Sequence, residues 1–200
     1  MATLNTTNIK HASSSSNNIV LASNGSVTIP TLTATNLTTN SSFGKILQVK
    51  QTFVNTAVSL SGVQSYTDIS GFNVSITPSS ASNKILVMVQ MNVSSEGEYI
   101  LKLVRTAGGT STDIGNSTAG NYTSFTGGFQ NTARSGYYDL LDKNFNFLDD
   151  AQDTNAHVYK VQWSNITNVN TYINRTGYST TGIYYSYSGC STITVMEVAA

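Results

Sequence analysis

The chain has 200 residues, only 10% of them charged, and ten basic residues balance ten acidic ones to a net charge of zero. Roughly 25% of the residues of an ordinary soluble domain are charged, so Ser, Thr, Asn and Gly must supply most of the polar surface here. A neutral surface has no long-range field to gather nucleic acid or anionic lipid, which leaves sugars and proteins as partners. The single cysteine, Cys190, excludes an intrachain disulfide and a cysteine-based zinc site, and we expect it to be buried or half-buried.

Residues 1–15 lack the apolar core of a secretion signal, and no apolar run approaches the length of a membrane span. We therefore expect no membrane insertion. If the protein works outside a cell, we expect that it does not get there by an N-terminal secretion signal, and release by lysis as part of a virus particle would satisfy both observations.

Residues 1–44 differ in composition from the rest of the chain. They are polar as far as residue 18, and two short apolar runs, residues 19–21 and 27–29, then flank an Asn-Gly pair. Asn-Gly between such runs is a strong hairpin signal. We expect an extended arm with a short hairpin that becomes ordered on a partner, and a disordered tail is an equally weighted alternative. Residues 45–200 are expected to form the head domain.

The head domain shows repeated short strand patterns and no convincing helical period, apart from a possible single turn over residues 139–143. Eight to ten such strands predict an all-β fold, an antiparallel sandwich or barrel, and a jelly-roll-like β-sandwich suits the count best. The last strand is expected near the middle of a sheet. The expected strands are residues 45–60, 66–77, 84–93, 99–105, 112–114, 122–129, 137–148, 157–163, 171–176 and 191–198.

Residues 84–93, KILVMVQMNV, form the strand around which the domain is organised. Alternate residues from position 85 to position 93 are all apolar, so one face of this strand is expected to line the core. Leu86 and Met88 begin the other face, which turns polar at Gln90. These two side chains need a second cover, from this chain or from another copy of it, and we assign them to a trimer interface.

Five aspartates gather around the end of one expected strand: Asp139, Asp142, Asp149, Asp150 and Asp153. Glycoside hydrolysis needs two carboxylates on opposite sides of one bond. These five are instead expected to be solvated loop residues, and they lack the regular ligand spacing of known calcium loops, which leaves calcium binding open. The only histidines, His11 and His157, lie in different sections of the chain. We therefore predict no catalytic residue, no metal site and no cofactor.

Four tyrosines near the C-terminus have binding character: Tyr178, Tyr184, Tyr185 and Tyr187 lie among Ser, Thr and Gly. Tyrosine offers a large amphipathic contact at small entropic cost, and Ser and Gly adapt around it. Packing on a sheet is the alternative for any single one of them. Together they are the predicted receptor-binding residues, with a host-surface glycan or protein as the partner.

Five segments in this order resemble the C-terminal head domains of virion structural and tail-fibre proteins from marine bacteriophages, notably cyanophages. They are SITPSSASNKILVMV (residues 75–89), LKLVR (101–105), YKVQW (159–163), YINRTG (172–177) and STITVMEVAA (191–200). The opening, with NIKHASSSSNNIVL at residues 8–21, also looks like segments of such fibres. The similarity covers most of the chain, although this chain has no repetitive shaft.

The resemblance implies a virion component without enzyme activity, usually a homotrimer, with a jelly-roll head and an N-terminal arm that attaches it to other virion proteins. A short tail fibre docked by residues 1–44 is the leading hypothesis, and a capsid decoration protein of the same build is the first alternative. A monomeric carbohydrate-binding module that uses the tyrosine segment is the second. In the first two cases the protein is located in the virion and assembled in the host cytoplasm.

Overall fold

The computed structural model describes residues 8–9, 12–13, 15, 19–21, 23, 27–28, 45–62, 65–117, 126–130, 139–165, 168–178 and 186–200. Within these residues all the regular secondary structure is β-strand, and all strand pairs are antiparallel. The all-β prediction is therefore confirmed. The chain divides into two compact units, Met1–Ser41 and Ser42–Ala200.

The first unit contains a small three-stranded sheet in which β2 (Ile19–Leu21) lies between β1 (Asn8–Ile9) and β3 (Val27–Thr28). Val20 pairs with Thr28 across β2 and β3, which confirms the hairpin predicted around the Asn-Gly pair. The sequence did not predict β1, because a strand of two residues is too short to show alternation.

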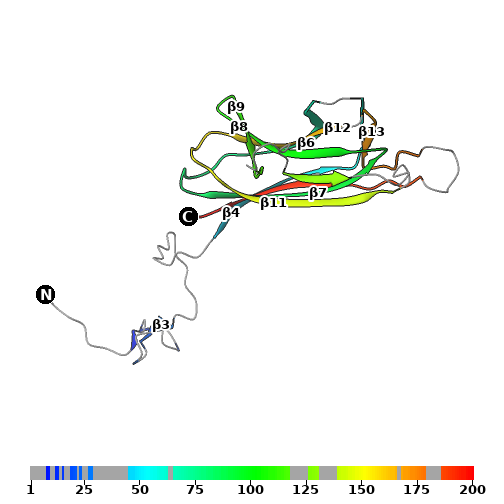
Figure 1. Ribbon diagram of the computed structural model, residues 1–200. Coiled ribbons are helices and arrows are strands. Elements are labelled where there is room, and N and C mark those ends of the chain that lie inside the picture. Colours follow the sequence, from blue (N-terminus) through cyan, green and yellow to red (C-terminus); the bar gives the residue numbers. More distant parts are fainter. Residues whose placement is uncertain are drawn as a thin grey trace. The chain divides into compact units, whose positions relative to one another are not determined.

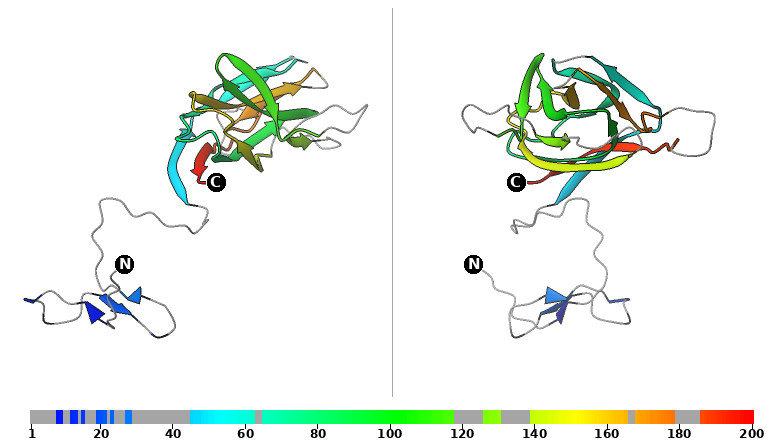
Figure 2. Two further views of the ribbon diagram at one scale, coloured as in Figure 1. Left: turned by 90° about the vertical axis from the view of Figure 1, so that its left-hand side faces the viewer. Right: turned by 45° about the vertical axis from the view of Figure 1, so that its right-hand side comes forward.

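The second unit is a β-sandwich of two packed sheets, which Figure 1 and Figure 2 show as two layers. The β7 sheet consists of β4 (Ile46–Val54), β5 (Val58–Ser61), β7 (Lys84–Ser95), β11 (Leu141–Asp150), β13 (Asn170–Ile173) and β14 (Ser191–Val198). The β8 sheet consists of β6 (Thr67–Ile76), β8 (Tyr99–Ala107), β9 (Thr110–Ile114), β10 (Gly127–Gln130) and β12 (His157–Asn165).

Strand pairing gives each sheet four positions across its width. In the β7 sheet, β11 pairs with one edge of β7, and β14 and β13 share its other edge one after the other, followed by β4 and β5. In the β8 sheet, β9 and β10 share one edge of β8, and β12 and then β6 follow on its other side. The predicted central place of the last strand is confirmed, because β14 lies between β4 and β7.

The core lies between the two sheets and follows the predicted alternation. Ile85, Val87, Val89, Met91 and Val93 of β7 are all buried. They meet large side chains from the β8 sheet, including Phe72, Leu101, Leu103, Tyr159 and Trp163. Each fully buried side chain of this size contributes roughly 1.5–3 kcal/mol of transfer free energy, so this layer is the main source of stability.

Three local predictions are wrong, each for an identifiable reason. The strand expected over residues 45–60 is broken, because the Asn174 side-chain amide donates to the carbonyl oxygens of Val54 (2.8 Å) and Thr56 (3.1 Å) and occupies acceptors at the break. The single helical turn at residues 139–143 is absent, because Leu141 already pairs with Val93 in β11. Cys190 is exposed rather than buried.

Candidate interaction face

The outer face of the β7 sheet is built from side chains that alternate with the core residues of β11, β7, β14 and β4. Residues paired across neighbouring antiparallel strands point to the same side, so pairing defines three rows that cross all four strands. The rows are Val49–Met196–Leu86–Leu148, then Gln51–Thr194–Met88–Asn146, then Phe53–Thr192–Gln90–Asn144. Each row lies about 7 Å from the next, because two residues of a strand separate them.

The first of these, which we call the apolar row, has four apolar side chains from four strands and no charge. Val49 and Leu148 at its two ends are 51% and 53% exposed, and Leu86 and Met196 between them are half-buried. Met88 in the neighbouring row is 42% exposed. Leu86 and Met88, predicted to need a second cover, therefore belong to a wider apolar surface whose other members come from β4, β11 and β14.

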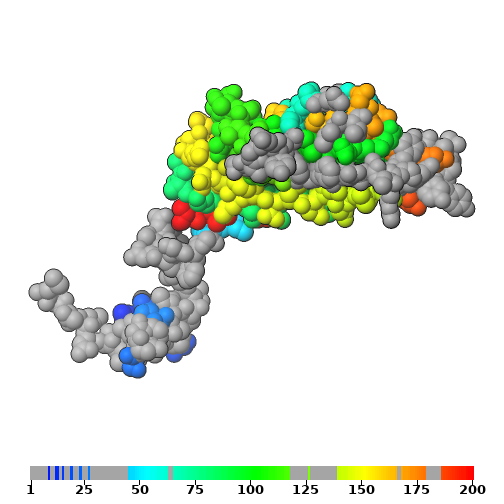
Figure 3. Space-filling view, in the orientation of Figure 1, coloured from blue at the N-terminus to red at the C-terminus, as the bar shows by residue number. Residues whose placement is uncertain are grey.

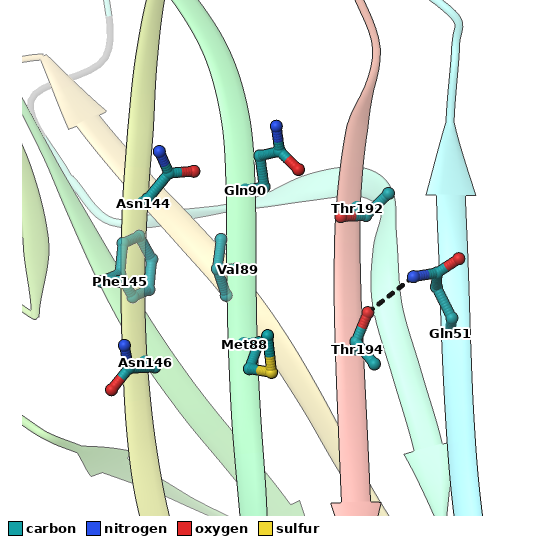
Figure 4. A pocket seen from close by; sticks show the side chains of 9 residues that line it. All are labelled: Gln51, Met88, Val89, Gln90, Asn144, Phe145, Asn146, Thr192 and Thr194. Carbon is teal, nitrogen blue, oxygen red and sulfur yellow. Dashed lines mark hydrogen bonds between the residues drawn. The ribbon is translucent and has the colours of Figure 1, made fainter.

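A hollow of about 380 Å³ lies beside the apolar row, over the other two rows (Figure 4). Its polar lining consists of amides and hydroxyls: Gln51, Gln90, Asn144, Asn146, Thr192 and Thr194. The Gln51 amide donates to the Thr194 hydroxyl at 2.8 Å. Among the residues that the structure describes, no ionisable side chain lines the hollow. It is a neutral polar cavity with the side chain of Met88 as an apolar element.

The outer face of the β8 sheet carries two ion pairs, whereas on the β7 sheet charged side chains such as Lys84, Asp150 and Asp142 lie in the rows that flank the three described above. The Lys160 ammonium contacts the Asp68 carboxylate at 2.8 Å, and the Gln162 amide donates to the same carboxylate at 2.7 Å. Burial alone would raise the pKa of Asp68, but the hydrogen bonds from Lys160 and Gln162 outweigh it and lower the pKa below its usual value. Lys102 lies 3.0 Å from Asp113 and 4.0 Å from the centre of the Tyr66 ring.

Some of the predicted acidic cluster lies inside the sandwich. Asp149, expected to be a solvated loop residue, is buried and accepts hydrogen bonds from Arg105 at 2.9 Å and from the Tyr159 hydroxyl at 2.8 Å. That expectation is wrong because the strand extends through Asp150 and turns position 149 inward. Burial, and then the Asp149 charge, raise the pKa of Tyr159. The Arg105–Asp149 pair joins β8 to β11 and so ties the two sheets together.

The remaining acids of the cluster do not converge on one point. Asp142 accepts from the Asn92 amide at 2.6 Å, Asp150 pairs with Lys84, and Asp153 lies 3.0 Å from the Nε2 atom of His157. A backbone hydrogen bond from Asn155 and one from His157 hold the pKa of Asp153 below its usual value. Among the residues that the structure describes, no group of three His, Cys, Asp or Glu side chains is placed to hold a metal ion.

Glu197 is a second fully buried carboxylate, on the inner side of β14. It accepts hydrogen bonds from the Gln48 amide (2.6 Å), the Ser79 N–H and hydroxyl (2.6 and 2.7 Å) and the Asn83 amide (2.6 Å). Burial by itself raises the pKa of Glu197, but these hydrogen bonds outweigh it and lower the pKa to about 2. The carboxylate therefore fixes the end of β14 to the segment before β7.

The structure describes two of the four predicted receptor-binding tyrosines. Tyr187 is 58% exposed and Tyr178 is half-buried, while Tyr184 and Tyr185 lie outside the described residues. The Thr176 N–H donates to the carbonyl oxygen of Tyr187 at 3.0 Å, which holds the two ends of this segment together. Neither Tyr178 nor Tyr187 lines the hollow on the β7 sheet.

No protein-family model and no curated protein matches this chain. In the part of the chain that the structure describes, no helix has the length and apolar character needed to cross a membrane. The candidate site therefore rests on the geometry of the β7 sheet. Sequence reasoning found Leu86 and Met88 but missed Val49, Met196 and Leu148 as their neighbours, because pairing between strands so far apart in the chain leaves no local signal.

Proposed function

We propose that the protein is a structural subunit of a bacteriophage particle: a short trimeric tail fibre or appendage, attached by its N-terminal unit. The resemblance of five ordered segments to phage head domains supports this proposal, and so does the β-sandwich fold of the second unit. Viral capsid proteins commonly use sandwiches of the jelly-roll type.

The strand order favours the jelly-roll variant of the sandwich. Along the chain, β4, β7, β11 and β14 of one sheet alternate with β6, β8 and β12 of the other. Across the sheets, the orders are β4–β14–β7–β11 and β6–β12–β8 followed by β9 and β10. Such an arrangement of two interleaved four-stranded sheets is what two Greek keys produce.

The apolar row is the observation that carries the proposed self-association. Exposed apolar side chains occur singly on most proteins, whereas four in adjacent cross-strand positions form a continuous surface. A second copy seated on Val49, Leu86, Met196 and Leu148 would remove this surface from water, and the row presents no charge that would have to be desolvated. A trimer in which each copy covers this row is the arrangement we propose.

The N-terminal unit is the proposed attachment point to other virion proteins. Its strands have two or three residues each, so it buries little apolar surface of its own. Contacts with a partner would add to the few that this sheet makes. A capsid decoration protein has the same requirements, and electron microscopy of labelled virions separates it from a tail appendage.

Light scattering of the full chain and of residues 45–200 tests the proposal. We expect both to have three times the mass of one chain, which is 21.4 kDa for the full length. In phage assembly, the shortened chain should fail to join particles. A monomeric full chain contradicts the trimer, and normal incorporation of residues 45–200 contradicts attachment through the first unit.

The predicted host contact is tested by changing Tyr178, Tyr184, Tyr185 and Tyr187 together to Ser. We expect weaker adsorption to host cells with an unchanged solution mass. Unchanged adsorption would assign the tyrosine segment a purely structural role.

A further inference from the structure

We infer that the neutral hollow on the outer face of the β7 sheet is a binding site for an uncharged oligosaccharide. This goes beyond the proposed structural role and differs in place from the tyrosine segment. Its volume of about 380 Å³ lies within the 300–1,000 Å³ typical of ligand sites. The volume suits a short stretch of a sugar chain.

The amides in the hollow are available to a ligand. The side chains of Gln90, Asn144 and Asn146 make no hydrogen bond within the described residues, and Figure 4 shows them on two neighbouring strands, β7 and β11. Each amide group offers two N–H donors and an acceptor oxygen, a combination that suits the hydroxyl groups of a sugar. By contrast, the Asn92 amide on the same face is already bonded to Asp142.

The apolar contacts that a sugar ring needs are present at the same place. Met88 lies between Thr194 and Asn146 in the middle row, where its thioether can contact the C–H face of a ring. Phe53 follows Thr192 in the third row and is 57% exposed. It does not line the hollow, so its ring is open to stacking on a sugar chain that extends beyond the hollow along this row. Amides, hydroxyls and one aromatic ring in adjacent rows therefore offer both kinds of contact.

Charge and backbone pairing argue against other ligands. The lining has no ionisable group, so an anionic or cationic ligand would find no counter-charge there. β7 is paired on both edges, by β11 and β14, and β14 is paired on both edges, by β4 and β7. The two central strands of the floor thus have no free backbone edge on which a peptide could add as a further strand, and only β4 and β11 at its sides are paired on a single edge in the described residues.

The third-row part of the hollow can act independently of the apolar row, whereas Met88 and Asn146 in the middle row lie only about 7 Å from the apolar row, beside the proposed contact. The third row, with Gln90 and Asn144, lies about 13 Å from the apolar row, because four residues of a strand separate them. A copy seated on Val49 and Leu148 therefore leaves room for a ligand over the third row.

Titration calorimetry on the full chain, with neutral hexasaccharides of glucose, mannose and galactose as probes, tests this site. We expect at least one of them to bind with a millimolar or lower Kd. Asn144→Leu and Asn146→Leu should each weaken that binding about tenfold, the effect of losing one or two neutral hydrogen bonds. The matched control is Asn73→Leu, on the exposed face of β6 in the other sheet, which should bind like the parent chain.

Three results would overturn the inference. The first is that none of the hexasaccharides binds at millimolar concentration. The second is that Tyr178→Ser with Tyr187→Ser abolishes binding while Asn144→Leu does not, which places the site on the tyrosine segment. The third is that Asn144→Leu changes the solution mass and no sugar binds, which shows that a second copy covers the hollow. A monomeric chain that binds sugar normally would contradict the proposed trimer alone.

Discussion

The two outer faces of the sandwich differ in where their charged side chains lie. On the β8 sheet, Lys160 and Lys102 pair with aspartates at the surface, and both aspartates are about half exposed. On the β7 sheet, the corresponding region has an apolar row and a hollow lined by amides, and Glu197 of β14 points inward. In Figure 3 the residues of β11 (yellow), the strand at one edge of the β7 sheet, lie along the surface of the molecule. The charged side chains Lys84, Asp150 and Asp142 on the outer face of the β7 sheet thus lie on either side of the region that we propose to be covered, not within it.

The largest expected effect comes from placing charge in the apolar row and beside it, on the outer face of the β7 sheet. Leu86→Lys together with Met88→Lys should abolish the trimer and give monomers or aggregates in light scattering, because unpaired ammonium groups cannot enter an apolar contact without a large desolvation penalty. Ser75→Lys, on the exposed face of β6, is the control and should leave the mass unchanged. A soluble trimer carrying both changes on the β7 sheet would contradict our assignment of the interface.

A carboxylate from each sheet gives the second test. Glu197→Ala should lower the free energy of unfolding in urea by about 3 kcal/mol, because the buried amide of Asn83 loses its acceptor and the Ser79 N–H and hydroxyl lose theirs. Asp68→Ala should lower it by less than about 1 kcal/mol, because its carboxylate is 54% exposed and water replaces the lost partners. Equal effects of the two changes would show that the Glu197 site is open to water.

Acid should remove the contribution of Glu197 to stability. The folded-state pKa of Glu197 is about 2 and its ordinary value is 4.5, so its contribution is complete above pH 4.5 and is lost as the pH falls toward 2. Urea unfolding at a series of pH values should show this loss in the parent chain and a smaller one in Glu197→Gln. The pKa of Asp68 is shifted in the same direction. Parallel curves for the parent chain and Glu197→Gln would contradict the low pKa.

The smallest effect is expected from the surface pair itself. Lys160→Met should lower the free energy of unfolding by about 0–1 kcal/mol at low salt, and the difference from the parent chain should shrink as salt screens the pair. Trimer mass should stay the same across that salt range, because the apolar row contains no charge. Dissociation of the trimer by salt would show that charged groups hold the copies together.

Alternation in the sequence predicted much of the fold. The inward faces of β7, β12 and β14 follow from period-two patterns, and the packing of Ile193 and Val195 beside Val87 confirms the last strand as a central one. The break between β4 and β5 was not predictable, because Asn174, more than a hundred positions away, supplies the hydrogen bonds at that point.

The candidate site was less accessible to sequence reasoning. Leu86 and Met88 stood out because they are apolar on the second face of a strand that is already apolar on the first. The hollow had no comparable signal, since exposed Asn and Thr residues are common everywhere in this composition. Only the register of four strands brings Asn144, Gln90 and Thr192 into one row.

The central place of β14 also governs when the sandwich can form during protein synthesis. β14 lies between β4 and β7, and its Thr194 bonds to Gln51, which is 143 positions earlier in the chain. At a translation rate of about 5–20 residues per second, a ribosome needs roughly 7–30 s to make that stretch. Throughout this time β4 lacks its partner, and once β7 has been made most of one of its edges lacks a partner too; unpaired edges readily join other chains. Nascent copies translated side by side on one messenger are therefore most exposed to mispairing just before residues 191–198 emerge.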